Sequence, residues 1–253
     1  MTARAPLVEI EDVLTDRATT GRSLLVELVG PAGAGKTAVR RAISDLDPST
    51  QPGFPVPWQR SLLPVLREGL GMVVEGLELL KYKQSSRWLT ARHLLRVRAL
   101  ERVFASARVP ATTILLDEGP VYGLCRVLLE LGYGTASGIT APPGIWRRSL
   151  ERWMGKLDLV VWLDAPDDVL TRRIRERPKE HRVKQSFASE AHEFLRRYRA
   201  AYMDVLGRLR DEGRLTVVEM DTGRQSVTDV AAGVRSALSR LRESTARASG
   251  REA

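Results

Sequence analysis

Eight consecutive residues have the types and spacing needed to bind a phosphate chain. The segment GPAGAGKT follows an apolar strand-like run and fits the pattern G-x-x-x-x-G-K-[ST] of the P-loop. Its glycines allow successive backbone N–H groups to point at phosphate oxygens, and a helix starting near Gly35 adds the positive end of its dipole. In such a loop Lys36 reaches the β- and γ-phosphates, and the Thr37 hydroxyl binds Mg²⁺. We therefore expect ATP and Mg²⁺ as ligands. The expected nucleotide-binding residues are Gly30, Pro31, Ala32, Gly33, Ala34, Gly35, Lys36 and Thr37.

Two acids follow a second apolar run. The run Thr112–Leu116 predicts a strand, and Asp117 and Glu118 come directly after it. A carboxylate at the end of a strand can hold Mg²⁺ or its water, or accept a proton from an attacking hydroxyl. The alternative is that one of the two acids only caps the helix that Pro120 opens.

Arginines are concentrated in the second half of the chain. Five of them fall within the eleven residues Arg172–Arg182. Arginines that close over a phosphate chain would neutralise the charge of the transferring group. The same run is also compatible with a solvated basic face, and the residue pattern alone leaves both interpretations open.

The elements that must position these residues alternate between strands and helices. This alternation predicts an α/β, three-layer P-loop NTPase fold with a mainly parallel sheet of four to five strands. The strand ends would bring the P-loop, Asp117-Glu118, Asp164 and Asp221 to one edge. Strands are expected at Leu24–Val29, Thr112–Leu116, Leu159–Leu163 and Leu215–Met220, with a short edge strand considered at Phe54–Val56. Helices are expected from the P-loop to about Leu46 and at Trp58–Leu80, Arg87–Ala107, Pro120–Leu131, Trp146–Gly155, Asp167–Arg177, Phe187–Arg210 and Val227–Leu241.

The chain divides into one domain and two flanking segments. We expect an N-terminal extension over residues 1–22, a domain over 23–243 with a lid at about 177–187, and a disordered tail over 244–253. The first sixteen residues contain acids and lack an apolar centre, so we expect no signal peptide there.

Composition limits the environment and the partners. The net charge is +9, yet basic residues do not interleave with aromatic ones, so a nucleic-acid partner is not favoured. No apolar run approaches the ~20 residues of a membrane span. The single cysteine, Cys125, excludes an internal disulfide and favours a reducing, cytoplasmic location.

The order of these motifs resembles that of thymidylate kinases and, more widely, of the nucleoside and nucleotide kinases with a P-loop. The resemblance covers most of residues 24–241. Its first half rests on the P-loop and Asp117. Its second half rests on Leu163-Asp164-Ala165-Pro166, Val169, Arg173-x-Arg175-x-Arg177, Arg182, Phe187, Arg197, Tyr202 and Asp221.

The resemblance implies an ATP-dependent phosphotransferase with an arginine-rich lid. The implied catalytic residues are Lys36, Asp117, Arg173 and Arg182. Thr37 and Asp117 are the implied metal ligands. Arg96 falls where the family places an arginine that holds the phosphate of the acceptor, so Arg96 and Glu118 are the expected acceptor-binding residues. An apolar helix face between residues 87 and 131 could support a homodimer, as in that family.

One departure from the family bears on the acceptor. Thymidylate kinases have an Asp-Arg pair after the second strand, whereas this sequence has Asp117-Glu118. An acid would repel a monophosphate but can hydrogen-bond a free hydroxyl. The acceptor, whether nucleoside, nucleotide or another alcohol, stays open at this point. Two other functions are weighed: a nucleotide-binding regulatory module with slow hydrolysis, and a kinase of nucleic-acid ends. The N-K-x-D sequence of guanine-specific switches is absent.

Overall fold

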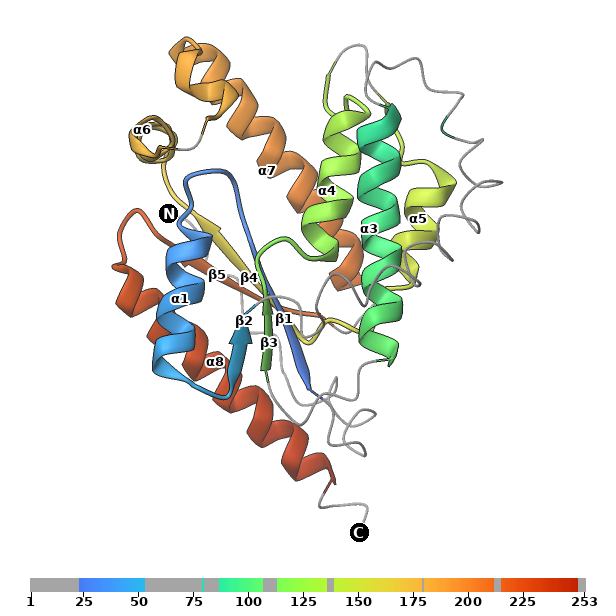
Figure 1. Ribbon diagram of the computed structural model, residues 1–253, viewed down its shortest axis with the longest axis vertical. Coiled ribbons are helices and arrows are strands. Elements are labelled where there is room, and N and C mark those ends of the chain that lie inside the picture. The colour runs from blue at the N-terminus through green and yellow to red at the C-terminus, as the bar shows by residue number, and fades with distance from the viewer. Residues whose placement is uncertain are drawn as a thin grey trace.

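A five-stranded parallel sheet lies between two layers of helices (Figure 1). Its strand order is β2-β3-β1-β4-β5, with β1 at the centre. The strands are β1 Leu24–Val29, β2 Thr50–Pro52, β3 Thr113–Leu116, β4 Leu159–Asp164 and β5 Thr216–Asp221. The computed structural model describes residues 23–52, 79, 87–106, 113–135, 139–178, 180–211 and 215–249.

The predicted α/β sheet architecture is confirmed, and the central strands show why it forms. β1 and β4 are almost wholly buried, as expected for apolar strands covered on both faces. The edge strand β2 pairs with β3 at Thr50–Pro52. The segment considered for it, Phe54–Val56, lies outside the described residues. The backbone N–H of Thr113 donates to the carbonyl of Ser49, so pairing begins earlier than the apolar residues suggested.

The helices lie on both faces of the sheet. α1 and α8 cover one face, and α3, α4, α5 and α7 lie on the other (Figure 1). Their bounds are α1 Lys36–Leu46, α3 Arg87–Ser106, α4 Pro120–Glu130, α5 Gly144–Glu151, α6 Asp167–Glu176, α7 Ala188–Asp211 and α8 Val227–Ser249, with a short 3₁₀ helix, η3, at Arg182–Gln185. The helix expected at Trp58–Leu80 lies outside the described residues, apart from Leu79. In the described part, no helix is long and apolar enough to cross a membrane.

The last helix extends beyond its expected end. We expected it to stop at Leu241 and a disordered tail to start at residue 244, whereas α8 continues to Ser249. Just past the expected end, Arg242 anchors the helix, because its guanidinium donates to three oxygens at the edge of the sheet. These acceptors are Asp47 Oδ2 at 3.3 Å, Ser49 Oγ at 3.0 Å and Thr113 Oγ1 at 2.6 Å.

Close packing fixes α3 against α4. A Cβ atom on Gly123 of α4 would lie 2.4 Å from the Val97 side chain of α3, so only glycine fits there. Two buried indole rings add polar anchors. Trp146 donates to the carbonyl of Leu124 at 2.9 Å, and Trp153 donates to that of Val97 at 3.0 Å. This packing supports the β3–α4 turn, which carries the strand-end acids.

Candidate nucleotide-binding and active site

The P-loop joins the central strand β1 to α1, as its sequence predicts. Gly30 and Gly33 have φ angles of 144° and 85°, in the region that favours glycine. A Cβ atom on Gly30 would lie 2.0 Å from the carbonyl oxygen of Leu163 in the neighbouring strand β4. The loop therefore needs glycine both for its backbone conformation and for its close contact with β4.

Lys36 folds back over this loop. Its ammonium Nζ donates to the carbonyl oxygens of Gly30 at 2.7 Å and Pro31 at 2.9 Å. The pKa of Lys36 is lowered to about 8, mainly by burial of the side chain and in addition by the charge of Arg177, while Asp117 and Glu118 act in the opposite direction. The lysine thus lies near charged groups from two other segments of the chain, the turn after β3 and the end of α6.

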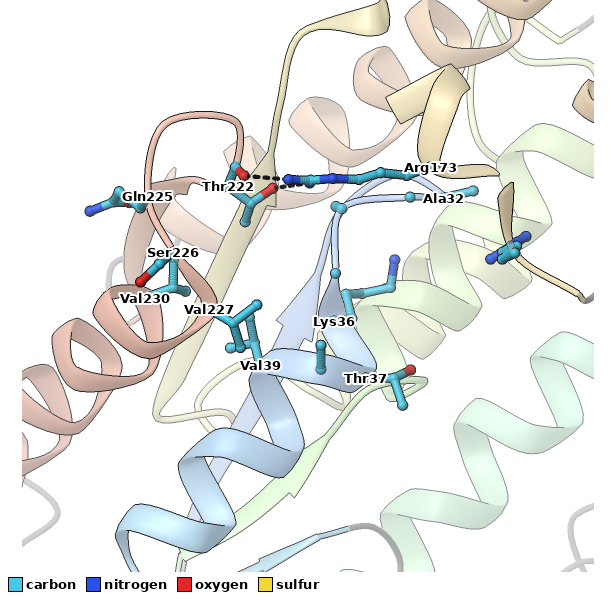
Figure 2. Close-up of a pocket in the computed structure, with 15 residues that line it drawn as sticks. Ala32, Lys36, Thr37, Val39, Arg173, Thr222, Gln225, Ser226, Val227 and Val230 are labelled. Carbon is cyan, nitrogen blue, oxygen red and sulfur yellow. Dashed lines mark hydrogen bonds between the residues drawn. The ribbon is translucent and has the colours of Figure 1, made fainter. Parts of the chain in front are cut away.

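A cavity of about 640 Å³ opens beside the loop (Figure 2). The P-loop and the first turn of α1 form one wall, and Arg173 and Arg177 from the end of α6 form another. The third wall is the segment after β5, including Thr222 and Val227. Asp221 was expected at this edge, whereas the residues after it were not predicted from the sequence. Their only signal was their position directly behind a predicted strand end.

Arg173 spans the top of the cavity (Figure 2). Its Nη1 donates to Thr222 Oγ1 at 3.1 Å, and its Nη2 donates to the Thr222 carbonyl at 2.8 Å. The backbone N–H of Thr222 in turn donates to the carbonyl of Asp164 at 2.8 Å. Arg173 therefore forms part of a hydrogen-bonded wall that ties α6 to the ends of β4 and β5.

Arg177 is the cation next to Lys36. Its Nε is buried and makes no hydrogen bond within the described part of the chain. Arg177 and Lys36 line the same cavity, and the charge of Arg177 lowers the pKa of Lys36. Arg175 instead donates to the carbonyl of Ser186 at 3.1 Å and is exposed. Arg182 begins η3, and its side chain is outside what the structure describes. A closing arginine lid stays a prediction.

Asp117 and Glu118 lie at the same edge as Lys36, as predicted, but each is paired with an arginine. Asp117 Oδ2 lies 3.3 Å from Arg40 Nε of α1. Glu118 Oε2 lies 2.9 Å from Arg96 Nη1, and the Glu118 carbonyl accepts from Arg96 Nη2 at 2.9 Å. The two residues expected to bind the acceptor are thus brought together and bind each other.

Glu27, in the middle of β1, was not among the site residues predicted from the sequence. The side chain is fully buried, and its carboxylate accepts from the backbone N–H groups of Val121 and Tyr122, each at 2.9 Å. Burial raises the pKa of Glu27 to about 7, although these hydrogen bonds, a further one from the Gly119 backbone and the charge of Arg96 lower it. The available signal was an acid inside the apolar run LLVELV.

The residues present fit a Mg²⁺ ion held mainly by phosphates. No group of three histidine, cysteine or acidic residues suited to a metal occurs among the described residues. Mg²⁺ at a nucleotide needs only one or two protein oxygens, because phosphates and water complete its octahedron. Thr37 is exposed in the first turn of α1, and Asp117 follows β3, so these two oxygen-bearing residues meet that requirement.

The fold has clear counterparts among solved structures. No family model matches the sequence, and no curated protein is significantly similar to it. Thymidylate kinase from Candida albicans is similar at a TM-score of 0.54 and 13% identity, over 88% of this chain and 94% of that chain. Deoxyadenosine kinase from M. mycoides with bound dATP gives a TM-score of 0.50 at 12% identity, over 85% of this chain and all (100%) of that chain. The chain therefore has the fold of the P-loop nucleoside and nucleotide kinases, which confirms the resemblance at the level of the fold.

Proposed function

We propose that this chain is a phosphotransferase that moves the γ-phosphoryl group of Mg-ATP to a hydroxyl of a small molecule. The observation that carries the proposal is the cavity lined together by the P-loop residues from Ala32 to Thr37, Lys36 among them, and by Arg173 and Arg177 at the end of α6. The likeness in fold to a thymidylate kinase and a deoxyadenosine kinase supports the same reaction class.

The walls of the cavity suggest how a nucleotide would lie. Its phosphates would rest on the N–H groups of the P-loop, next to Lys36. Arg173, held by Thr222, presents a planar guanidinium on which a base can stack, and Val227 and Val230 supply apolar surface nearby. We therefore assign Arg173 to nucleotide binding, in addition to the catalytic role that the resemblance implies.

The transfer step needs cations that stabilise the negative charge on the phosphoryl group in the transition state. The hydroxyl oxygen of the acceptor forms a bond to the γ-phosphorus while the bond to the bridging oxygen of ADP breaks, and charge spreads over the transferring group. Lys36 and Arg177 are placed to stabilise that charge, and Arg182 is proposed as a third cation from η3. Thr37 and Asp117 would hold Mg²⁺, which when bound neutralises phosphate charge.

The acceptor side favours a compound without a phosphate. Glu118 already neutralises the guanidinium of Arg96, so a monophosphate would have to displace a carboxylate to reach it. Asp117 would orient the acceptor hydroxyl or accept its proton. We therefore propose a neutral or cationic alcohol as the acceptor, with nucleosides included.

A coupled assay of ADP release tests this proposal. The panel contains nucleosides, nucleoside monophosphates, sugar alcohols and aminoglycoside-like alcohols, each with Mg-ATP, and Lys36→Ala is the inactive control. We expect turnover on an uncharged or cationic alcohol and its loss in the control. Intact transfer in Lys36→Ala would overturn the proposal. Tight ATP binding without turnover on any compound would favour the regulatory module instead.

The homodimer also remains a prediction. In α3 the apolar residues Leu94, Val97 and Leu100 are buried, whereas Trp88 is 76% exposed and Leu89 37% exposed. Less of this helix is therefore open to a second copy than its apolar pattern suggested. Sedimentation of the purified chain would measure its oligomeric state, and cell fractionation would test the expected cytoplasmic location.

A further inference from the structure

We infer that Glu27 is a positioning residue, which holds the turn of Asp117–Gly119 in place opposite the P-loop by binding the first turn of α4. Its contact with α4 is independent of the proposed function, whereas its effect on phosphoryl transfer rests on that function. No motif in the sequence assigns a role to this residue.

The geometry shows a helix cap supplied from a distant strand. Glu27 Oε2 accepts from the N–H of Val121, and Oε1 accepts from the N–H of Tyr122. The first N–H groups of a helix have no partners within the helix. The N-cap of α4 is Gly119, which offers no side chain to bind them. The carboxylate of β1 therefore does what a serine or aspartate at the N-cap usually does.

Space around the carboxylate is tightly fitted. A Cβ atom on Gly119 would lie 2.7 Å from Oε2 and Cδ of Glu27. Gly119 has a φ of −85°, which any residue can adopt, so the glycine is required for space and not for its backbone conformation. Any larger residue there would push the carboxylate away from α4.

This contact joins the two sides of the site. Glu27 is in register with Leu116 of β3 and Val160 of β4, so its backbone is fixed by strands on both sides. The P-loop begins at Gly30, three residues after Glu27 and directly after the end of β1. The turn that Glu27 holds carries Asp117 and Glu118, whose charges act on Lys36. A single buried side chain thus sets the distance between the phosphate-binding loop and the acids that face it.

The test is a double-mutant cycle at Glu27 and Gly119, the residues on the two sides of the contact. The variants are Glu27→Ala, Gly119→Ala, the double variant and the milder Glu27→Gln. The control is Val26→Ala, which is buried in the same strand but points to the opposite face of the sheet.

The first measurement is hydrogen exchange of the Val121 and Tyr122 amides. We expect about tenfold faster exchange in each single variant, and less than about twofold further change when Gly119→Ala is added to Glu27→Ala.

The second measurement separates positioning from general loss of stability. It uses the panel compound that the wild-type chain phosphorylates, or the hydrolysis of Mg-ATP by water if it phosphorylates none. We expect Glu27→Gln and Gly119→Ala to lower the rate constant for transfer by about tenfold, because small misplacements of reacting groups are costly, while the affinity for Mg-ADP stays within about twofold. Val26→Ala should leave the transfer rate per folded molecule unchanged.

Two results would overturn the inference. One is that Glu27→Ala and Gly119→Ala change amide exchange independently of each other. The other is that Glu27→Gln and Gly119→Ala both leave the transfer rate unchanged. Absence of turnover on every panel compound would count against the proposed function alone, because amide exchange needs no acceptor.

Discussion

Arg96 and Glu118 bind each other through two contacts, one to the carboxylate and one to the carbonyl, both at 2.9 Å. Arg96 comes from α3 and Glu118 from the turn before α4, so the pair joins the two residues that were expected together at the acceptor. The Arg96 guanidinium, which the resemblance assigns to a phosphate of the acceptor, is thus already neutralised by the Glu118 carboxylate.

Removing the acid should therefore free the arginine for an anion. We expect Glu118→Ala to raise kcat/KM for a nucleoside monophosphate relative to the matching nucleoside by roughly tenfold, because Arg96 no longer has a competing carboxylate. The measurement is steady-state kinetics on both compounds. Glu193→Ala breaks an exposed pair with Arg196 elsewhere and is the control. An unchanged ratio would contradict the assigned role of the pair.

Substitutions of Arg173 and Arg177, at the end of α6, should change different kinetic constants. Arg173 is held in the wall that would face the base, so Arg173→Ala should raise KM for ATP by about tenfold with a smaller effect on kcat. Arg177 lines the same cavity as Lys36, so Arg177→Ala should lower kcat by about a hundredfold or more. Arg175→Ala, on the same helix but exposed, should change neither. Equal effects of Arg173→Ala and Arg177→Ala on both constants would refute this division.

Nucleotide binding should weaken at alkaline pH. The pKa of Lys36 in the free protein is about 8, lowered mainly by burial, so the lysine loses its proton as the pH rises through that value. A neutral amine binds phosphate less well, so the affinity for Mg-ADP should fall by about tenfold per pH unit above the pKa. Titration calorimetry between pH 7 and about pH 9.5 measures this. Lys36→Arg, which keeps its charge there, should show a flat profile.

Glu27 should make stability depend on pH. Its pKa of about 7 in the folded chain exceeds its ordinary value of 4.5, so the folded state binds the proton more tightly. This contribution is fully present below pH 4.5 and is lost as the pH rises to about 7. The loss corresponds to about 3 kcal/mol of unfolding free energy. The groups around the carboxylate are Arg96, Tyr122, Cys125 and Tyr202.

Denaturant unfolding of the wild type and Glu27→Gln isolates that effect. The free energy of unfolding of the wild type should fall relative to that of Glu27→Gln between about pH 4.5 and about pH 7.5. Other titrating groups, such as His93 with its pKa lowered to about 4 by burial, are common to both proteins and cancel in the difference. Parallel profiles would show that the carboxylate does not titrate in this range.

Local patterns in the sequence predicted the parts of the site that depend on neighbouring residues. Gly30–Thr37 specifies its own loop, and apolar runs followed by acids place Asp117 and Glu118 at the sheet edge. Contacts between distant segments could not be predicted in this way. Glu27 meets residues 94 and 95 positions further along the chain, and Arg173 meets Thr222 at a separation of 49. The partners Val121, Tyr122 and Thr222 belong to no motif, so only the folded chain identifies these pairs.

The hydrogen bonds of Lys36 have a consequence for the energetics of ligand capture. The ammonium group already donates to the carbonyls of Gly30 and Pro31, so a nucleotide exchanges partners with the loop and does not meet an unsatisfied charge. The net gain is the difference between phosphate and carbonyl as acceptors, less the hydration of the released carbonyls. Measured affinities for nucleotides should accordingly reflect a competition between the phosphates and the loop's own carbonyls for the Lys36 ammonium.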